Sequence, residues 1–282
     1  MGSVIEFDGI EFTKAHACGN DFLIVDAGRV GGRDLAQLSR EMCARTTGIG
    51  ADGVEYLTQT GEREGRIHLY NADGSRGEIS GNGTRCVAAW MAYQAGLRVG
   101  DEVRIETDAG MRVGRMESAA GVEFRFTTGM GVPTVQRATV MLDGDVAIEG
   151  AVVGMGNPQF VAVVENEHFV VAGRTWQEAG AAICTHPDFS AGTNVEFVRR
   201  VAEDLIEIRI YERGVGPTSS SGTGTSASAA AMIALEGAPS RLRVLAPGGE
   251  QLVEWPSTSA ELQLTGPAVV VARGQWLAGE RD

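Results

Sequence analysis

The sequence predicts an α+β fold of two pseudo-symmetric domains, each a curved, mostly antiparallel sheet or barrel around one central helix. Three observations lead to this prediction. The 282 residues suggest two domains. Segments of the first half recur in the second half. Each half also contains one nearly uncharged helical run among short strands that alternate apolar and polar residues.

An internal duplication is the clearest of these features. Ser80-Gly81-Asn82-Gly83-Thr84 recurs 141 residues later, half the chain length, as Ser221-Gly222-Thr223-Gly224-Thr225. Other segments match at this or a nearby offset: Cys43 with Cys184, Val54-Glu55-Tyr56 with Val195-Glu196-Phe197, Asn71 with Glu212, and Gly19-Asn20 with Gly156-Asn157. Because the order is kept, we expect domains at residues 1–125 and 126–260, related by a pseudo-twofold axis, with the segment from about 260 to 282 returning to the first domain.

The two helices are expected directly after the matched glycine-rich turns. One runs from Thr84 to near Gly96 and the other from Thr225 to Gly237, and glycine is typical just past the last helical turn. Both are almost uncharged on every side, which indicates burial all round. Strands are expected at residues 22–25, 66–70, 103–107, 121–127, 159–164, 205–211, 241–245 and 268–272.

Composition excludes several classes of protein. The formal net charge of −13 argues against nucleic-acid binding, which needs a basic face. The sequence has no run of 18 apolar residues that could form a membrane helix, and residues 1–8 show no secretory signal. A cytoplasmic location is therefore expected. The four cysteines form no CxxC pair, which favours reduced, buried thiols and no metal site.

The glycine-rich turns predict a site for a small anion. A turn that leads into a helix N-terminus presents backbone N–H groups and partial positive charge. Two such turns are expected to meet at the cleft between the domains and to hold a carboxylate there. The alternative is that Ser80 and Ser221 are plain helix N-caps.

Polar residues near these turns suggest further recognition of a ligand. Asn20, Asn157 and Asn194 stand beside Gly or Pro or at the start of a strand, and Arg213 follows a strand. Together they could hold a second carboxylate and an amine, since arginine suits bidentate carboxylate binding. Each asparagine alone is more often a turn former.

The chain resembles the diaminopimelate epimerase family over essentially its full length. The motifs that carry the resemblance occur in order: Lys14-Ala15-His16-Ala17-Cys18-Gly19-Asn20-Asp21-Phe22, Gly48-Ile49-Gly50-Ala51-Asp52-Gly53, Asn71-Ala72-Asp73-Gly74-Ser75, Gly156-Asn157-Pro158, Gly192-Thr193-Asn194-Val195, Glu212-Arg213-Gly214-Val215-Gly216 and Pro247-Gly248-Gly249. The resemblance implies the duplicated fold and an amino-acid epimerase site at the domain interface that needs no cofactor.

Proton handling is where this sequence departs from the family. The resemblance implies two cysteines as an acid–base pair, yet Ser80 and Ser221 stand there, Gln159 replaces a histidine, and Arg76 replaces an acidic residue. We take Ser80, Ser221, Glu212 and Gln159 as the catalytic candidates. The positions that the resemblance assigns to substrate binding match the family: Asn20, Asn71, Gly81, Asn82, Asn157, Asn194, Arg213, Gly222 and Thr223.

Serine is a poor base compared with cysteine. A thiol has a pKa of about 8.5 and an alcohol one near that of water, about 15.7, so ionising serine costs roughly 10 kcal/mol more. A helix N-terminus supplies only about 0.3–2 kcal/mol. A serine therefore needs a neighbouring base, for which Glu212 is the candidate that the motifs support. Asp52, Asp73, Glu78 and His16 are further candidates for which a structural role is favoured, and no function is assigned to His68, His168 and His186.

Three functions remain open at this point. The first is epimerisation of diaminopimelate or a close analogue, in lysine and cell-wall precursor biosynthesis. The second is a one-base isomerase or dehydratase of the same superfamily, and the third is a non-catalytic amino-acid-binding homologue. The expected partner is a small amino-acid substrate, with no nucleic acid, membrane or cofactor; a homodimer is left open.

Overall fold

The computed structural model describes residues 9–77 and 80–277, so the N-terminal segment 1–8 and Glu78 lie outside the described residues. The chain divides into two compact units. The first comprises the described residues up to Phe126 and those from Pro267 onward, and the second runs from Thr127 to Gly266. The C-terminal strand therefore begins in the second unit and ends in the first.

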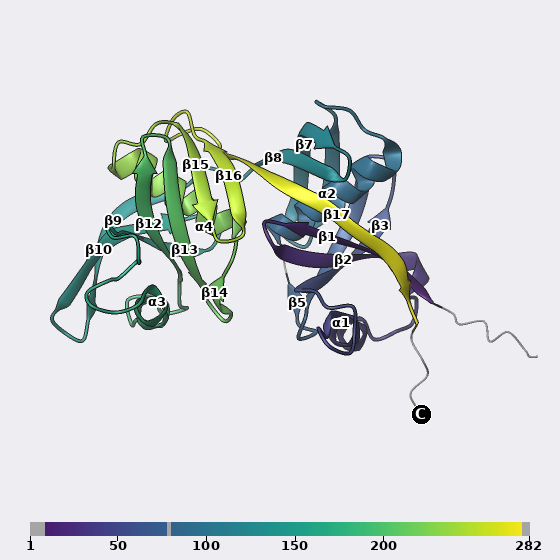
Figure 1. Ribbon diagram of the computed structural model, residues 1–282, viewed down its shortest axis with the longest axis horizontal. Helices are drawn as coiled ribbons and strands as arrows, with labels where there is room; N and C mark the ends of the chain where they lie inside the picture. Colours follow the sequence, from purple (N-terminus) through teal and green to yellow (C-terminus); the bar gives the residue numbers. More distant parts are fainter. Residues whose placement is uncertain (1–8, 78–79, 278–282) are drawn as a thin grey trace, which may run out of the picture. The chain divides into compact units, whose positions relative to one another are not determined.

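The first unit wraps its strands around the helix α2 (Gly81–Ala95) (Figure 1). Its strands are β1 (Ile10–Ala17), β2 (Asn20–Asp26), β3 (Gly53–Gln59), β4 (Glu64–Asn71), β5 (Arg76–Gly77), β6 (Glu102–Thr107), β7 (Gly110–Ala120), most of β8 (Glu123–Gly129) and the end of β17 (Gln263–Trp276). The pairing order is β17, β1, β2, β3, β4, β6 and β7, with β5 beside β4. The pairs β2–β3 and β4–β6 are parallel and the others antiparallel.

The second unit repeats this topology around the helix α4 (Gly222–Leu235). Its strands are β9 (Thr134–Leu142), β10 (Val146–Gly154), β11 (Pro158–Val163), β12 (Asn194–Ala202), β13 (Leu205–Glu212), β14 (Gly216–Thr218), β15 (Arg241–Ala246), β16 (Gly249–Glu254) and the start of β17. The order is β9, β10, β11, β12, β13, β15 and β16, with β14 beside β13. The parallel pairs are again the third and fifth neighbouring pairs in this strand order, β11–β12 and β13–β15.

Strand register preserves the duplication residue by residue. Phe22 lies opposite Gly53 in the first unit, and Gln159 lies opposite Asn194 in the second. Gln159 follows Phe22 by 137 positions, and Asn194 follows Gly53 by 141. Likewise, Val54 pairs with Tyr70 as Val195 does with Tyr211. The predicted α+β fold, with a mostly antiparallel sheet around a central helix made twice, is confirmed.

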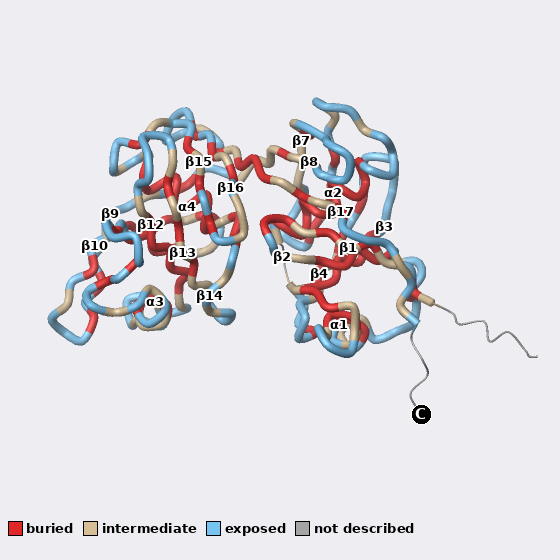
Figure 2. The backbone as a smooth tube through the Cα atoms, viewed as in Figure 1, coloured by how far each residue is buried: buried red, intermediate tan, exposed pale blue. Residues whose placement is uncertain are grey.

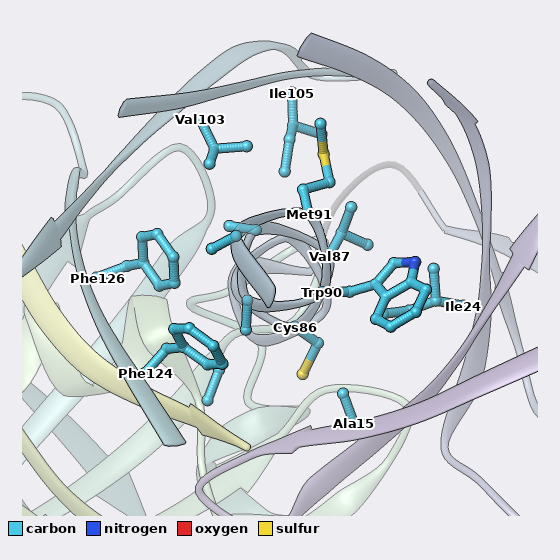
Figure 3. Close-up of a cluster of buried hydrophobic side chains, with 14 of the residues drawn as sticks. Ala15, Ile24, Cys86, Val87, Trp90, Met91, Val103, Ile105, Phe124 and Phe126 are labelled. Carbon is cyan, nitrogen blue, oxygen red and sulfur yellow. The ribbon is translucent and has the colours of Figure 1, made fainter. Parts of the chain in front are cut away.

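Burial explains why the central helices carry so little charge. Figure 2 shows α2 and α4 largely buried. Around α2, Cys86, Trp90 and Met91 pack among Ile24 and Phe126, all at most 7% exposed (Figure 3). The α4 core uses smaller helical residues, with serine hydroxyls bonded to the carbonyl one turn earlier. Both helices begin at the predicted glycine-rich turns and end within two residues of the predicted glycines.

Several elements were not predicted from the sequence. Two short helices, α1 (Leu35–Cys43) and α3 (Trp176–Cys184), pack in two smaller cores apart from the central helices. A 3-10 turn, η1 (Ala27–Arg29), follows β2. The strand expected from residue 121 begins at Glu123, and β1, β3, β7, β9, β10, β12, β14 and β16 had not been anticipated. None of the helices in the described part of the chain has the length and apolar content to span a bilayer.

Candidate active site

The two predicted serines begin the two central helices in the same way. Ser80 Oγ accepts the backbone N–H of Gly83 at 3.1 Å, and Ser221 Oγ accepts that of Gly224 at 3.3 Å. The N-cap interpretation is therefore confirmed for both. Capping does not consume the hydroxyl proton, so each serine can still donate a hydrogen bond at a helix terminus that favours negative charge. We refer to these two places as the Ser80 site and the Ser221 site.

A chain of oriented side chains supports the Ser80 site. Buried Arg85 donates to Asn82 Oδ1 at 2.6 Å, and Asn82 Nδ2 donates to Asn20 Oδ1 at 3.2 Å. Asn20 Nδ2 in turn donates to Asp52 at 2.7 Å, and Arg45 bonds the other oxygen of that carboxylate. The network fixes the orientation of both amides and brings together Asn20 and Asn82, two predicted binding residues.

Asn71 belongs to the turn after β4. Its side chain donates to Ser75 Oγ at 3.0 Å, and its backbone N–H donates to the carbonyl of the same residue. Asp73 accepts the backbone N–H of Ser75 at 2.8 Å. The Ser75 hydroxyl and this backbone N–H together lower the pKa of the exposed Asp73 carboxyl. Asn71, a predicted binding residue, thus forms part of a turn, and Asp73 has the structural role favoured by the sequence.

A carboxylate stands beside the serine at the Ser221 site. The Glu212 side chain, at the end of β13, lies close enough to Ser221 for the serine hydroxyl to affect its ionisation. Burial raises the pKa of Glu212, and the nearby hydroxyls of Ser221 and Thr218 lower it in part, so the net shift is upward. A carboxyl with a raised pKa next to an alcohol is the arrangement expected of a general base. The equivalent position at the Ser80 site is Asn71, which cannot serve as a base.

The remaining predicted residues of the second unit are held by local hydrogen bonds. Fully buried Gln159 donates through Nε2 to Asn157 Oδ1 at 2.7 Å. Asn194 Oδ1 accepts the backbone N–H of Arg213 at 2.9 Å, and the exposed Arg213 guanidinium donates to the carbonyl of Ala191. Gly222 and Thr223 form the first turn of α4.

Two glutamates under these turns were missed as site residues. Glu55 on β3 and Glu196 on β12 are fully buried, and none of their carboxyl oxygens has a hydrogen-bond partner among the described residues. Glu55 lies against Gly83, and Glu196 lies against Gly224. These are the two glycines whose backbone N–H groups donate to the capping serines. Burial raises the pKa of Glu55 to about 8. Their recurrence at the offset of 141 is visible in the sequence, but no role had been assigned to either glutamate.

Other side chains considered from the sequence have structural partners. Arg76 forms a two-pronged ion pair with Asp108, which His68 also approaches at 3.2 Å. His16 accepts the backbone N–H of Gly19. All four cysteines are buried and outside any disulfide, as predicted.

Solved structures with this fold include several epimerases and isomerases. A PhzF-family phenazine biosynthesis protein of Bacillus anthracis aligns over 96% of this chain and 99% of its own, with 16% identity and a TM-score of 0.71. A predicted epimerase of Pseudomonas aeruginosa aligns over 96% and 100%, with 15% identity and a TM-score of 0.72. A hydroxyproline epimerase of Agrobacterium vitis aligns over 95% and 91%, with 18% identity and a TM-score of 0.64. At these identities the likeness establishes the fold.

The duplicated fold, together with the chain's relatives, defines a class, the epimerase- and racemase-type isomerases. Within that class, the chain belongs to the diaminopimelate epimerase family, whose profile matches residues 12–135 and 151–271. The diaminopimelate epimerase of Desulforudis audaxviator is 36% identical over 279 residues, covering 95% of this chain and 99% of the relative. That of Moorella thermoacetica is 36% identical over 283 residues, with the same coverage.

Proposed function

We propose that the protein removes and returns the α-carbon proton of a diamino diacid, diaminopimelate or a close analogue. The names of its relatives support this substrate class. The two helix N-termini suit carboxylate groups, and the Arg213 guanidinium suits a second carboxylate. The oriented amides of Asn20 and Asn82 offer partners for an amine and a carboxylate.

The contact between Glu212 and Ser221 carries the mechanistic part of the proposal. Glu212 takes the hydroxyl proton of Ser221 as the serine oxygen takes the α-proton from carbon. The carbon–hydrogen bond breaks and its electron pair stays on the substrate. The α-proton ends on the serine oxygen, and the former hydroxyl proton ends on Glu212. The helix N-terminus stabilises the developing negative charge, and the reverse transfer returns a proton to carbon. Gln159 holds Asn157 in place through its amide.

The unequal chemistry of the two serine sites favours a second candidate. Glu212 stands beside Ser221, whereas Asn71 occupies the matching position in the first unit and bonds Ser75. A single base would exchange the proton on one face of the α-carbon, as in a one-base isomerase or dehydratase. Inversion requires a second group that donates from the opposite face, and we assign that role to Ser80.

The decisive experiment is proton NMR of meso- and LL-diaminopimelate with the protein in deuterium oxide. Deuterium entry with interconversion of the stereoisomers supports epimerisation, whereas deuterium entry or elimination without inversion supports the one-base alternative. Binding by calorimetry with no exchange over days overturns both and leaves an amino-acid-binding protein.

A matched pair of variants locates the base. Glu212→Gln should reduce exchange at least about 100-fold, the usual contribution of a general base. Glu207→Gln is the control, because Glu207 lies on the same strand but pairs with Arg199 and Arg209. Equal rates in the two variants would contradict the role of Glu212. We propose that the reaction takes place in the cytoplasm, where the four buried thiols would stay reduced.

A further inference from the structure

The Ser221 site contains a second carboxyl group that the proposed proton transfer does not use. Glu196 on β12 lies directly opposite Ile210 on β13, so Glu212 is its diagonal neighbour on the same strand pair. Side chains two residues apart on a strand share a face of the sheet. Diagonal neighbours are about 7–8 Å apart at the backbone, within reach of two long side chains. Both glutamates therefore extend on the sheet face that α4 covers.

Both glutamates also lie against one turn of α4. Glu212 lies near the Ser221 hydroxyl, and the backbone N–H of Gly224 donates to that same hydroxyl oxygen. A Cβ atom on Gly224 would come within 2.7 Å of Glu196 Oε1, so this carboxyl fills the space where another residue would carry its side chain. The turn from Ser221 to Gly224 thus has both carboxyl groups beside it.

Within residues 9–77 and 80–277, the elements that pack on this face against Glu196 provide no cation for its buried carboxyl. Neither β11 nor α4, which pack against β12, contains a charged residue. The inward-facing charged residue of β13 is Glu212, since Glu207 and Arg209 occupy the other face. On β12 itself, Arg200 lies near the far end and bonds the carbonyl of Glu236. Burial without a partner strongly disfavours a charged carboxylate, and a second negative charge nearby disfavours it further.

We propose that Glu196 is the protonated partner of Glu212, and that these two glutamates form a carboxyl pair that holds a single proton behind Ser221. Glu196, the more deeply buried member, keeps the proton, and Glu212, which faces the serine, carries the charge. Burial and the charge of Glu212 both raise the pKa of Glu196, in agreement with this division. Glu196 is a positioning residue in this scheme, since it acts through Glu212.

The first unit contains a natural control for this proposal. Glu55 occupies the matching position on β3, against Gly83, and is equally buried without a hydrogen-bond partner. Burial alone raises its pKa, since Asn71 replaces the second glutamate there. The two buried acids should therefore titrate similarly except for the influence of Glu212 on Glu196.

The test is a carbon-13 NMR titration of the ligand-free protein with labelled glutamate carboxyl carbons. Glu196→Gln and Glu55→Gln identify the two signals that stay protonated at neutral pH. Glu212→Gln should then lower the titration midpoint of Glu196 by about one pH unit or more, as expected for a coupled pair, and leave that of Glu55 unchanged. Glu212→Ala provides a second variant, and Glu207→Gln should shift neither midpoint.

An unchanged Glu196 midpoint in both Glu212 variants, or a Glu196 already ionised at pH 7, would overturn the carboxyl pair. This titration needs no substrate, so it separates the pair from the proposed function on which its catalytic meaning rests. If deuterium exchange occurs, it should fall at alkaline pH as Glu196 ionises, because a second negative charge opposes the carbanion. Glu196→Gln should abolish that fall; a fall that persists would contradict the role of Glu196.

Discussion

The carboxyl group of Glu55 lies against Gly83, on the side of α2 where any other residue would carry its Cβ atom. The helix and the buried acid thus fit together only because position 83 is glycine. Glu196 and Gly224 repeat the relationship in the second unit. A buried, uncompensated carboxyl is costly, so a chain that builds this pair twice retains it for a purpose other than stability.

Gly83→Ala should therefore destabilise the protein, although alanine normally stabilises a helix interior by about 1 kcal/mol relative to glycine. We expect the overpacked methyl group to lower the free energy of unfolding by about 1–3 kcal/mol. Chemical denaturation measures the loss, and adding Glu55→Ala should recover part of it. Gly81→Ala is the control, because no atom lies within 4 Å of its added Cβ. A Gly83→Ala variant as stable as the parent would contradict the close fit.

The sequence was most informative where local and global signals agreed. Each central helix had a glycine-rich start, an almost uncharged body and a glycine stop, and both were found. The helix α3 could have been found as well, because Thr175 and Glu178 form a capping box at its start. The strand β7 shows little alternation in burial, so periodicity gave no signal there.

The buried glutamates show why the site was only partly predictable. Alternation places a polar residue of a half-buried strand on the solvent face, but β3 is covered on both faces. The sequence revealed that Glu55 and Glu196 match, and it could not reveal that both point inward. The proximity of Glu212 to Ser221 was anticipated as a possibility, because the motif placed a base near the serine.

Asp21 should make the stability of the first unit depend on pH. Lys14 and Arg45 contact its carboxylate at 2.9 and 3.0 Å. Burial raises the pKa of Asp21, but the hydrogen bonds and charges of Arg45 and Lys14 outweigh it, and the net pKa lies below the ordinary 3.8. A lowered folded-state pKa gives stability that is present above the unfolded-state value and is lost as pH falls through the folded-state value.

Asp21→Asn should accordingly lower the free energy of unfolding at pH 7 by about 1–3 kcal/mol, typical of hydrogen bonds to a charged group. The difference from the parent should shrink as the pH falls below about 4. Denaturation curves across this range measure it. Asp26→Asn is the control on the same strand, because its exposed side chain caps Gly28 without a cation. A difference that persists at low pH would point to packing rather than charge.

Replacing the two serines by cysteine should increase proton exchange. A thiol is easier to ionise than an alcohol by roughly seven pKa units, about 10 kcal/mol, and a helix N-terminus favours the thiolate. We expect Ser80→Cys with Ser221→Cys to raise deuterium incorporation about 100-fold or more. Ser226→Cys is the control, because that hydroxyl bonds the carbonyl of Gly222 inside α4. An unchanged rate would show that the serines are not what limits the reaction.

Gln159 should matter only after the serines are replaced. Its buried amide donates to Asn157 but cannot accept a proton, whereas a histidine there titrates near 6.5, or lower if burial disfavours its charge. Gln159→His alone should leave deuterium exchange within about threefold, because both alcohols stay protonated. In the double-cysteine background it should raise the rate further and add a pH dependence at or below 6.5. Gln159→Met in that background should add neither. If Gln159→His alone matched the cysteine pair, the proton would pass through position 159 rather than through the serines.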